Sequence, residues 1–319
     1  MHKWLALVAV VSMAFFSSPA SAQPMGLGSS PQGTLTYAMA AAVAKTLTQK
    51  GNIQARVQPS SGTGTMIPLI NSGEIDIGFC NSLELYDAFH GVGTFNKRPN
   101  PNLRTVGIIF PIFTGLFVRA DSGIKSIKDM KGKRIAYGFT SQEIIAKTID
   151  AMLATGGLSI KDLTPVMVPN LVRGVDELIA GRVDITTFAL GGGKVAEADA
   201  SVGGIRFIPL MDTPEALAAL KKEFGTAYLT KVQPQPNYAG VKEPMTVMSY
   251  DYTVFAGKDV KAERIKLVTQ LIAQNKDLLS GSQPLFKRLD PQRMYTDIGV
   301  PFHDGAIAYY KEKDIKERK

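Results

Sequence analysis

The stretch that decides the fold runs from Pro59 to Ser82 and reads PSSGTGTMIPLINSGEIDIGFCNS. It opens with a loop of hydroxyl-bearing residues and glycines, continues through a short apolar segment and turns at Gly73. From Glu74 to Phe79, apolar residues alternate with polar or small ones, which is typical of a half-buried strand. This order predicts a loop, a helix, a tight turn and a strand, as in a βαβ unit. Because hydroxyls and glycines at a helix start suit an anion, we expect the stretch to form one wall of a ligand cleft.

A second copy of the pattern lies near the middle of the chain. The sequence GRVDITTF at 181–188 matches GEIDIGF at 73–79. Each copy lies at the end of a short predicted helix, which follows a strand and a proline, Pro59 in the first copy and Pro169 in the second. One such pattern occurs by chance, but two with the same upstream context indicate two similar α/β halves.

The loops that precede the two short helices differ in composition. Residues 59–64 read PSSGTG, whereas residues 169–174 read PNLVRG and have few hydroxyls or glycines. We therefore expect the first half to hold an anion through residues 60–63, and the second half mainly to close over it. Ser61→Ala is then expected to lose binding with little change in stability.

The N-terminus has the features of a secretory signal peptide, assigned to residues 1–22. Lys3 is followed by the apolar run Leu5 to Phe16 and by Ala20-Ser21-Ala22, so cleavage is expected before Gln23. The apolar run is too short to span a bilayer, and no later segment reaches the roughly 20 apolar residues required. The mature protein is therefore expected to be exported and soluble.

The composition of the chain limits which classes of function are possible. The chain has 319 residues, 45% of them hydrophobic, which is enough for two packed domains. The formal net charge is +8, but acidic residues interrupt each basic stretch, which is typical of solvated helix faces; a basic surface could still steer small anions. Export and the lack of a nucleic-acid-binding pattern argue against a nucleic-acid partner.

The single cysteine, Cys80, excludes an intramolecular disulfide. We expect it to be buried and inert because neither His90 nor His303 is spaced to activate it.

Two further loops precede predicted helices. Residues 25–34 lead into an alanine-rich helix that ends near Leu47, and Gly138 to Gln142 lead from a strand into a helix that ends near Thr155. Such loops leave free backbone N–H groups at a helix start, so one loop from each half could face a ligand across a gap. Gly26 and Gly28 match a dinucleotide motif only in part, and a simple flexible loop is the alternative. Two strands are expected between Leu103 and Val118, a long strand over 246–255, and helices over 261–280 and 304–319.

Together these features resemble the TAXI-type solute receptors of tripartite ATP-independent periplasmic (TRAP) transporters. The resemblance covers nearly the whole mature chain, although residues 28–33 depart from the family's Gly-x-Gly-Gly-x-Tyr-Tyr-like opening. It rests on the glycine-rich start with Tyr37, on SSGTGTMIPLINSGEIDIGFCNSLELYDAFHG (60–91), VRADSGIKSIKDMKGKRIAYG (118–138), ELIAGRVDITTFALGGG (177–193) and HDGAIAYYKE (303–312).

The resemblance implies an α/β fold of the two-lobed periplasmic binding protein kind (type II-like), with two mixed sheets flanked by helices and a ligand cleft between the lobes. Residues 23–117 and 246–319 would form lobe 1, and residues 118–245 lobe 2. It implies a monomeric periplasmic receptor, not an enzyme, with no cofactor or metal, that closes over a carboxylate such as an organic acid or acidic amino acid. The receptor would deliver this ligand to TRAP membrane permease subunits. The alternatives are the receptor of an ATP-dependent (ABC) importer and an exported enzyme acting on an acidic substrate.

The expected ligand contacts lie in loops at helix starts, where each residue could instead be an ordinary helix cap. They are Ser29, Ser30, Thr34, Tyr37, Ser60, Ser61, Gly62, Thr63, Asn81 and Ser82 in lobe 1, Thr114 and Gly115 near the hinge, and Thr140, Ser141, Gln142 and Phe188 in lobe 2. Arg173, at the start of the second-copy helix, is a separate candidate that either pairs with a carboxylate or stays solvated.

Overall fold

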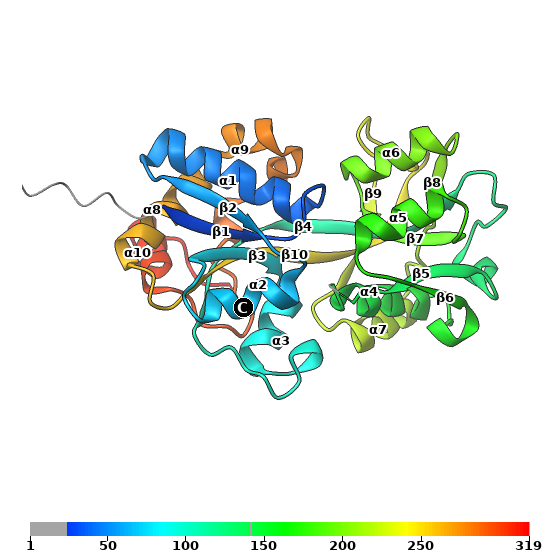
Figure 1. The fold of residues 1–319 in the computed structure, drawn as a ribbon, viewed down its shortest axis with the longest axis horizontal. Coiled ribbons are helices and arrows are strands. Elements are labelled where there is room, and N and C mark those ends of the chain that lie inside the picture. Colours follow the sequence, from blue (N-terminus) through cyan, green and yellow to red (C-terminus); the bar gives the residue numbers. More distant parts are fainter. Residues whose placement is uncertain (1–23, 141, 319) are drawn as a thin grey trace, which may run out of the picture.

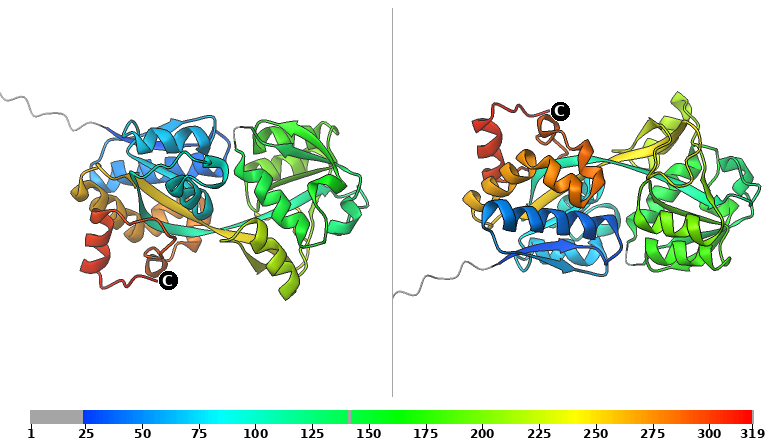
Figure 2. Two further views of the ribbon diagram at one scale, coloured as in Figure 1. Left: turned by 90° about the horizontal axis from the view of Figure 1, so that it is seen from below. Right: turned by 90° about the horizontal axis from the view of Figure 1, so that it is seen from above.

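The computed structural model describes residues 24–140 and 142–318, and the statements below concern those residues. The expected signal peptide, its cleavage site and Ser141 lie outside them. The elements gather into two α/β groups joined by the long strands β4 (Leu103–Arg119) and β10 (Met245–Gly257), as Figure 1 shows. Figure 2 shows the same separation from below and from above.

The first group holds the N-terminal elements and the C-terminal helices. Its members are β1 (Met25–Ser29), α1 (Leu35–Gly51), β2 (Ala55–Pro59), α2 (Thr63–Asn71), β3 (Ile77–Asn81), α3 (Ser82–His90), η1 (Gly93–Phe95), α8 (Ala262–Gln274), α9 (Lys276–Ser282), η4 (Pro284–Arg288), η5 (Pro291–Arg293) and α10 (Asp304–Glu312). The helix expected over 261–280 is thus broken at Asn275, and the helix expected over 304–319 ends at Glu312.

The second group is formed by the middle of the chain. Its members are η2 (Ile127–Met130), β5 (Arg134–Gly138), α4 (Ile144–Ala154), η3 (Ile160–Asp162), β6 (Thr164–Val168), α5 (Leu171–Ile179), β7 (Ile185–Ala189), α6 (Gly193–Ser201), β8 (Ile205–Phe207), α7 (Pro214–Glu223) and β9 (Tyr228–Val232). Within the residues that the structure describes, no helix is long and apolar enough to cross a membrane.

The sheets of the two groups are mixed and continuous with each other. Strand order is β2-β1-β3-β10-β4-β7-β5-β6, with β8 on β4 and β9 on β10. β1 is parallel to β2 and β3, and β5 is parallel to β6 and β7, while β10 and β4 are antiparallel to their neighbours. The α/β two-lobed architecture with mixed sheets is therefore the expected one.

The connecting strands change partners between the groups. Residues 103–114 of β4 pair with β10, and its residues 114–118 pair with β7. The expectation of two separate strands over Leu103–Val118 is wrong, because β4 runs unbroken through Pro111. Pro111 is in register with Asp251 of β10 and precedes the pairing with β7, which begins at Thr114, so its missing N–H removes no hydrogen bond to β7.

The repeated motif has the same structural role in both groups. The Asp76 carboxylate (Oδ2) accepts a hydrogen bond of 2.7 Å from the backbone N–H of Gly26, and Asp184 (Oδ2) accepts one of 2.9 Å from Arg134. Each aspartate precedes the third strand of its group and binds an N–H of the first strand, with a sequence separation of 50 in both cases. The motif aspartates therefore tie neighbouring strands together.

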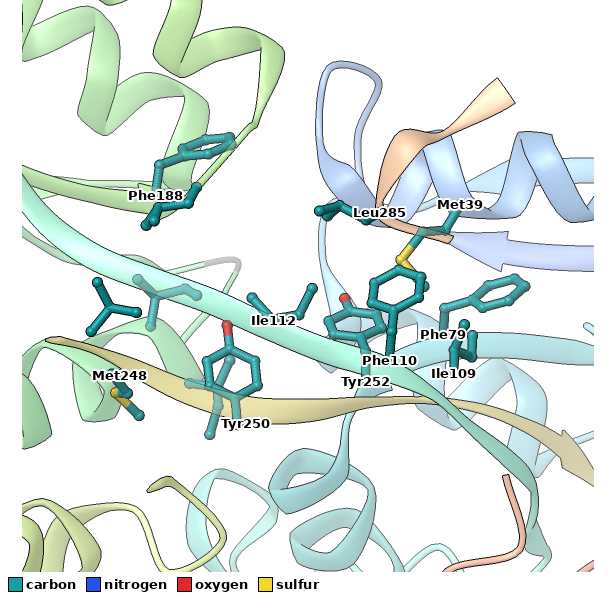
Figure 3. Close-up of a cluster of buried hydrophobic side chains, with 14 of the residues drawn as sticks. Met39, Phe79, Ile109, Phe110, Ile112, Phe188, Met248, Tyr250, Tyr252 and Leu285 are labelled. Carbon is teal, nitrogen blue, oxygen red and sulfur yellow. The ribbon is translucent and has the colours of Figure 1, made fainter. Parts of the chain in front are cut away.

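Apolar side chains fill the space between sheets and helices. Figure 3 shows part of the large buried cluster, which continues along β4 and β10 from one group toward the other. Cys80 belongs to a smaller cluster beneath α2 and α3 and is 0% exposed, as expected. Burial raises the pKa of its thiol, so the sulfur stays protonated.

Candidate functional site

A small cavity lies between the two groups of elements, which are called the first and second lobe below. It has a volume of about 70 Å³, and the residues around it come from α1, α2, α3, β4 and β10 on one side and from α4, α5 and β7 on the other. A cavity of this size holds a few water-sized groups. The lining joins segments far apart in the sequence: the hydroxyls of Thr36 and Tyr252, 216 positions apart, are hydrogen-bonded at 2.6 Å.

The starts of α1, α2 and α3 converge on this cavity. Thr34 caps α1 through its hydroxyl, which accepts a 3.3 Å hydrogen bond from the N–H of Tyr37. Thr63 is the first residue of α2, and Asn81 caps α3 by accepting a 2.8 Å hydrogen bond from the N–H of Glu84. Ser30, Thr34, Thr63 and Asn81 all line the cavity, so these expected contacts are brought together.

The second lobe and the connecting strand contribute further expected residues. Thr114, Gln142 and Phe188 line the same cavity. The Thr114 hydroxyl donates to the carbonyl of Phe188 at 3.1 Å, and the Gln142 side-chain oxygen accepts from the N–H of Leu171 at 2.9 Å. These bonds hold the first turn of α5 and the end of β7 against the cavity.

Other expected contacts lie outside the central cavity. They are Ser29, Tyr37, Ser60, Ser61, Gly62, Ser82, Gly115, Thr140 and Arg173. Ser61 and Thr140 are exposed and line a wider outer cavity of about 530 Å³ at the mouth of the cleft. Tyr37 lines a separate cavity of about 210 Å³ between α1 and the glycine-rich start of α6.

Ser61 is placed differently from Thr63, although only Gly62 separates them. The Ser61 hydroxyl bonds to the hydroxyl of Thr65 at 3.0 Å on the outer side of α2. The Thr63 hydroxyl points inward and donates to the buried carboxylate of Glu84. Within the expected 60–63 loop, Thr63 is thus the side chain that reaches the central cavity.

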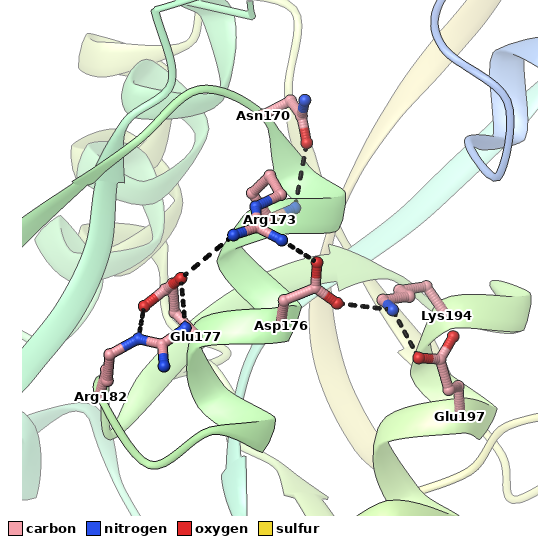
Figure 4. Close-up of polar contacts among 7 residues, drawn as sticks. All are labelled: Asn170, Arg173, Asp176, Glu177, Arg182, Lys194 and Glu197. Carbon is pink, nitrogen blue, oxygen red and sulfur yellow. Dashed lines mark hydrogen bonds and ion pairs between the residues drawn. The ribbon is translucent and has the colours of Figure 1, made fainter.

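Arg173 belongs to a surface network of charges on α5. Its guanidinium lies 3.1 Å from Asp176 and 3.8 Å from Glu177, while Lys194 lies 2.7 Å from the other oxygen of Asp176 (Figure 4). The Arg173 side chain is 54% exposed, and it lies away from the central cavity. In this arrangement the carboxylates of its own helix neutralise Arg173.

Glu84 is the functional candidate that the sequence did not reveal. Its position three residues after Asn81 fits an ordinary capping residue. In the structure it is 3% exposed and lines both the central and the outer cavity. Its carboxylate accepts from the Thr63 hydroxyl and, at 3.3 Å, from the Asn81 side-chain amide. Burial raises the pKa of Glu84 to about 7, the Thr63 hydrogen bond opposes this, and the charge of Asp87 adds to it.

Aromatic rings form another unexpected part of the lining. Tyr250 and Tyr252 of β10 line the cavity together with Phe188. Figure 3 shows the Tyr250 and Phe188 side chains on elements that flank β4, with Ile112 nearby. Burial raises the pKa of both tyrosines, with the charge of Glu84 as a further cause, so their hydroxyls remain neutral hydrogen-bonding groups. On a strand, such residues are indistinguishable from ordinary core aromatics.

An ion pair joins the two lobes. Lys147 of α4 lies 3.1 Å from Asp87 of α3. Arg98 and Glu143 line the outer cavity, so its wall carries both signs of charge. Among residues 24–140 and 142–318, no cluster of three or more His, Cys, Asp and Glu side chains could hold a metal ion.

Comparisons with known proteins agree with this architecture. The alkanesulfonate-binding protein SsuA from Xanthomonas axonopodis pv. citri, bound to MOPS, matches with a TM-score of 0.50 and 16% identity over 84% of this chain and 80% of that one. PhnD1 from Prochlorococcus marinus (MIT 9301), in complex with methylphosphonate, matches with a TM-score of 0.56 and 11% identity over 91% of this chain and 96% of that one. The expected fold class is therefore confirmed.

The two lobes, with the cavity between them, have the type II periplasmic-binding-protein fold. The chain belongs to the NMT1-like family, whose model matches residues 27–313.

Proposed function

We propose that the protein is an extracytoplasmic receptor that captures a small solute by lobe closure and delivers it to the membrane subunits of a TRAP transporter. The observation that carries this proposal is the central cavity between the lobes, because polar groups from both lobes line it. A ligand in this cavity contacts both lobes only when they are closed, so its binding energy favours the closed state.

The lobe assignment is part of the proposal. Residues 23–117 and 246–319 would move as one body and residues 118–245 as the other, with the hinge in β4 and β10. The change of strand partners along β4, from β10 over residues 103–114 to β7 over residues 114–118, supports a hinge in this region.

Delivery to a TRAP permease rests on the motifs that resemble TAXI-type receptors, which fall within the residues matched by the family model. Export to the periplasm rests on the signal-peptide pattern of the first 22 residues. A neighbouring gene for a fused TRAP permease would support the assignment, whereas a neighbouring ATPase gene would favour an ABC importer.

For the ligand, we propose a small carboxylate-bearing solute, an organic acid or an amino acid. The converging starts of α1, α2 and α3 support this class, because helix starts present N–H groups and the positive end of the helix dipole. Methylphosphonate, the ligand of the structural neighbour PhnD1, is likewise a small anion.

A thermal-shift screen with organic acids and amino acids, followed by small-angle scattering, tests the receptor function. A ligand at 100 times its Kd should stabilise the folded protein by roughly 2.7 kcal/mol and reduce the radius of gyration as the lobes close. The only tryptophan of the sequence is Trp4, in the expected signal peptide, so calorimetry is preferable to tryptophan fluorescence for affinities. If no compound raises the melting temperature and none changes the scattering, the receptor function is refuted.

A further inference from the structure

We propose that the solute carries a protonated amine and that the Glu84 carboxylate binds this amine in the central cavity. This inference rests on the proposed function, because it specifies the ligand class of the same cavity. It selects amino acids and other amines over simple organic acids.

The first argument is the charge of the lining. Among the described residues around the central cavity, Glu84 is an acid, and none is Lys, Arg or His. The bases near the mouth are placed elsewhere: Lys147 pairs with Asp87, and Arg98 lines only the outer cavity. A ligand in the central cavity therefore meets a carboxylate without a protein cation beside it.

The second argument is the unfilled hydrogen-bonding capacity of Glu84. An ionised carboxylate accepts about four hydrogen bonds. Within the described part of the chain, its side-chain oxygens accept from Thr63 and Asn81, both neutral donors. A carboxylate that is 3% exposed is costly to ionise unless a positive charge compensates it. A ligand ammonium supplies that charge together with up to three donors.

The rest of the lining suits the same kind of ligand. Phe188, Tyr250 and Tyr252 present aromatic rings to the cavity, and ring faces attract cations. The starts of α1 and α2 remain available for a ligand carboxylate, so an amino acid would satisfy both ends. A simple acid would instead place a second negative charge near Glu84. At about 5 Å and an effective dielectric of about 20, this repulsion weakens binding by roughly 300-fold.

The protonation of Glu84 predicts the direction in which ligand affinity changes with pH. Because burial raises the pKa of Glu84 to about 7, a proton competes with the amine at neutral pH. Affinity for an amine should rise about tenfold per pH unit below pH 7 and level off above it. A ligand that presents only a carboxylate to Glu84 should show the opposite trend. The other titratable groups around Glu84 are Cys80, Asp87, Arg98, Glu143, Lys147, Tyr250 and Tyr252.

Isothermal titration calorimetry with matched compounds tests the inference. The probes are L-glutamate with glutarate, L-alanine with propionate and L-leucine with 4-methylpentanoate, together with putrescine as an amine without a carboxylate. At about pH 8, where Glu84 is ionised, we expect an amine-bearing compound to bind and its amine-free counterpart to bind at least roughly 100-fold more weakly. Glu84→Gln should weaken amine binding by roughly 100-fold.

Glu143→Gln is the matched control, because it removes an exposed carboxylate that lines only the outer cavity. It should change affinity less than about twofold. If Glu84→Gln does not fold, the pH profile of the unaltered protein still decides the matter. Equal or tighter binding of the amine-free acids, or affinity that falls from pH 6 to about pH 8, overturns the inference and leaves the receptor function intact. If no compound of either kind binds, the receptor function fails as well.

Discussion

Lys147 and Asp87 form an ion pair between the two lobes, with 3.1 Å between the ammonium nitrogen and a carboxylate oxygen. Lys147 lies on α4 and Asp87 on α3, so the pair joins the two lobes. The Asp87 side chain is only 6% exposed, which limits screening by solvent. Gly93, with φ at +56°, passes so close that a side chain there would collide with both charged groups. The glycine therefore leaves room for the pair.

Removal of this pair should weaken ligand binding. In Lys147→Met the closed state loses the contact, whereas the open state, with Lys147 and Asp87 apart, is little affected. We expect affinity to fall roughly 5- to 30-fold, or about 1–2 kcal/mol, measured by calorimetry with whichever compound the screen identifies. Small-angle scattering should show a smaller closed fraction at the same ligand saturation.

Lys161→Met, at an exposed lysine in η3, is the control for the loss of one positive charge. Asp87→Asn should resemble Lys147→Met, and the double variant should cost little more than either change alone. Fully additive effects of the two changes would mean that the ion pair does not hold the lobes together.

Glu84 should make the stability of the ligand-free protein fall as pH rises. Its pKa is about 7 in the folded chain, against an ordinary value of 4.5. The folded state therefore holds a proton that the unfolded state has released, and the corresponding stability, complete below about pH 4.5, is lost as pH rises to 7. The glutamine in the Glu84→Gln variant cannot ionise. The unfolding free energy of this variant, minus that of the unaltered protein, should therefore increase by roughly 2–3 kcal/mol from pH 4.5 to pH 8. Urea unfolding at several pH values measures this, and a difference independent of pH would contradict it.

The motif aspartates should matter for stability and not for ligand affinity. Asp76→Ala leaves the N–H of Gly26 without its carboxylate partner, and Asp184→Ala does the same to Arg134. Each change should cost roughly 1–2 kcal/mol of unfolding free energy. Glu74→Ala, at an exposed position near Asp76, should stay within about 0.5 kcal/mol. Denaturant unfolding checks the three variants, and a loss of ligand affinity without a loss of stability would assign the aspartates to the site instead.

Arg288 should stabilise the region where the chain passes between the lobes. Its guanidinium lies 3.8 Å from the centre of the Phe113 ring and donates a 3.1 Å hydrogen bond to the carbonyl of Pro111. It also lies 5.7 Å from the ring centre of Tyr238 in the second group. Burial lowers the pKa of Arg288 to about 10, so it remains charged at neutral pH.

Arg288→Ala is therefore expected to lower the unfolding free energy by roughly 1–2 kcal/mol. Arg288→Lys keeps the charge but cannot stack as a plane, so it should recover less than half of the loss. Thermal unfolding of both variants measures this. Full recovery by lysine would mean that charge, and not stacking, holds β4.

The repeated halves could be predicted from the sequence because the signals are local. In both copies a glycine ends the helix with φ near +80° or +70°, at Gly73 and Gly181, and the alternating residues that follow form a strand. The aspartate inside each copy was visible as part of the pattern. Its bond to a strand 50 residues earlier was not, because that contact depends on the order of strands in the sheet.

The candidate site could be predicted only in part. Thr34, Thr63 and Asn81 could be predicted because a helix start is recognised from neighbouring residues. The fold then brings these helix starts together around the cavity. The sequence did not distinguish Ser61 from Thr63 as a ligand contact. The structure does, because the two side chains point in different directions at the start of α2. Tyr250 and Tyr252 could not be distinguished from core residues before the lobes were placed.

The sequence by itself determined the duplicated α/β halves and the loops at helix starts, since each depends on residues within a few positions of one another. The tertiary structure alone decided which of those loops face a shared cavity, and it made Glu84 the acid within that cavity. The physical reason is that burial and charge at a cleft between lobes depend on segments up to 216 positions apart, such as Thr36 and Tyr252, and no local pattern records their meeting.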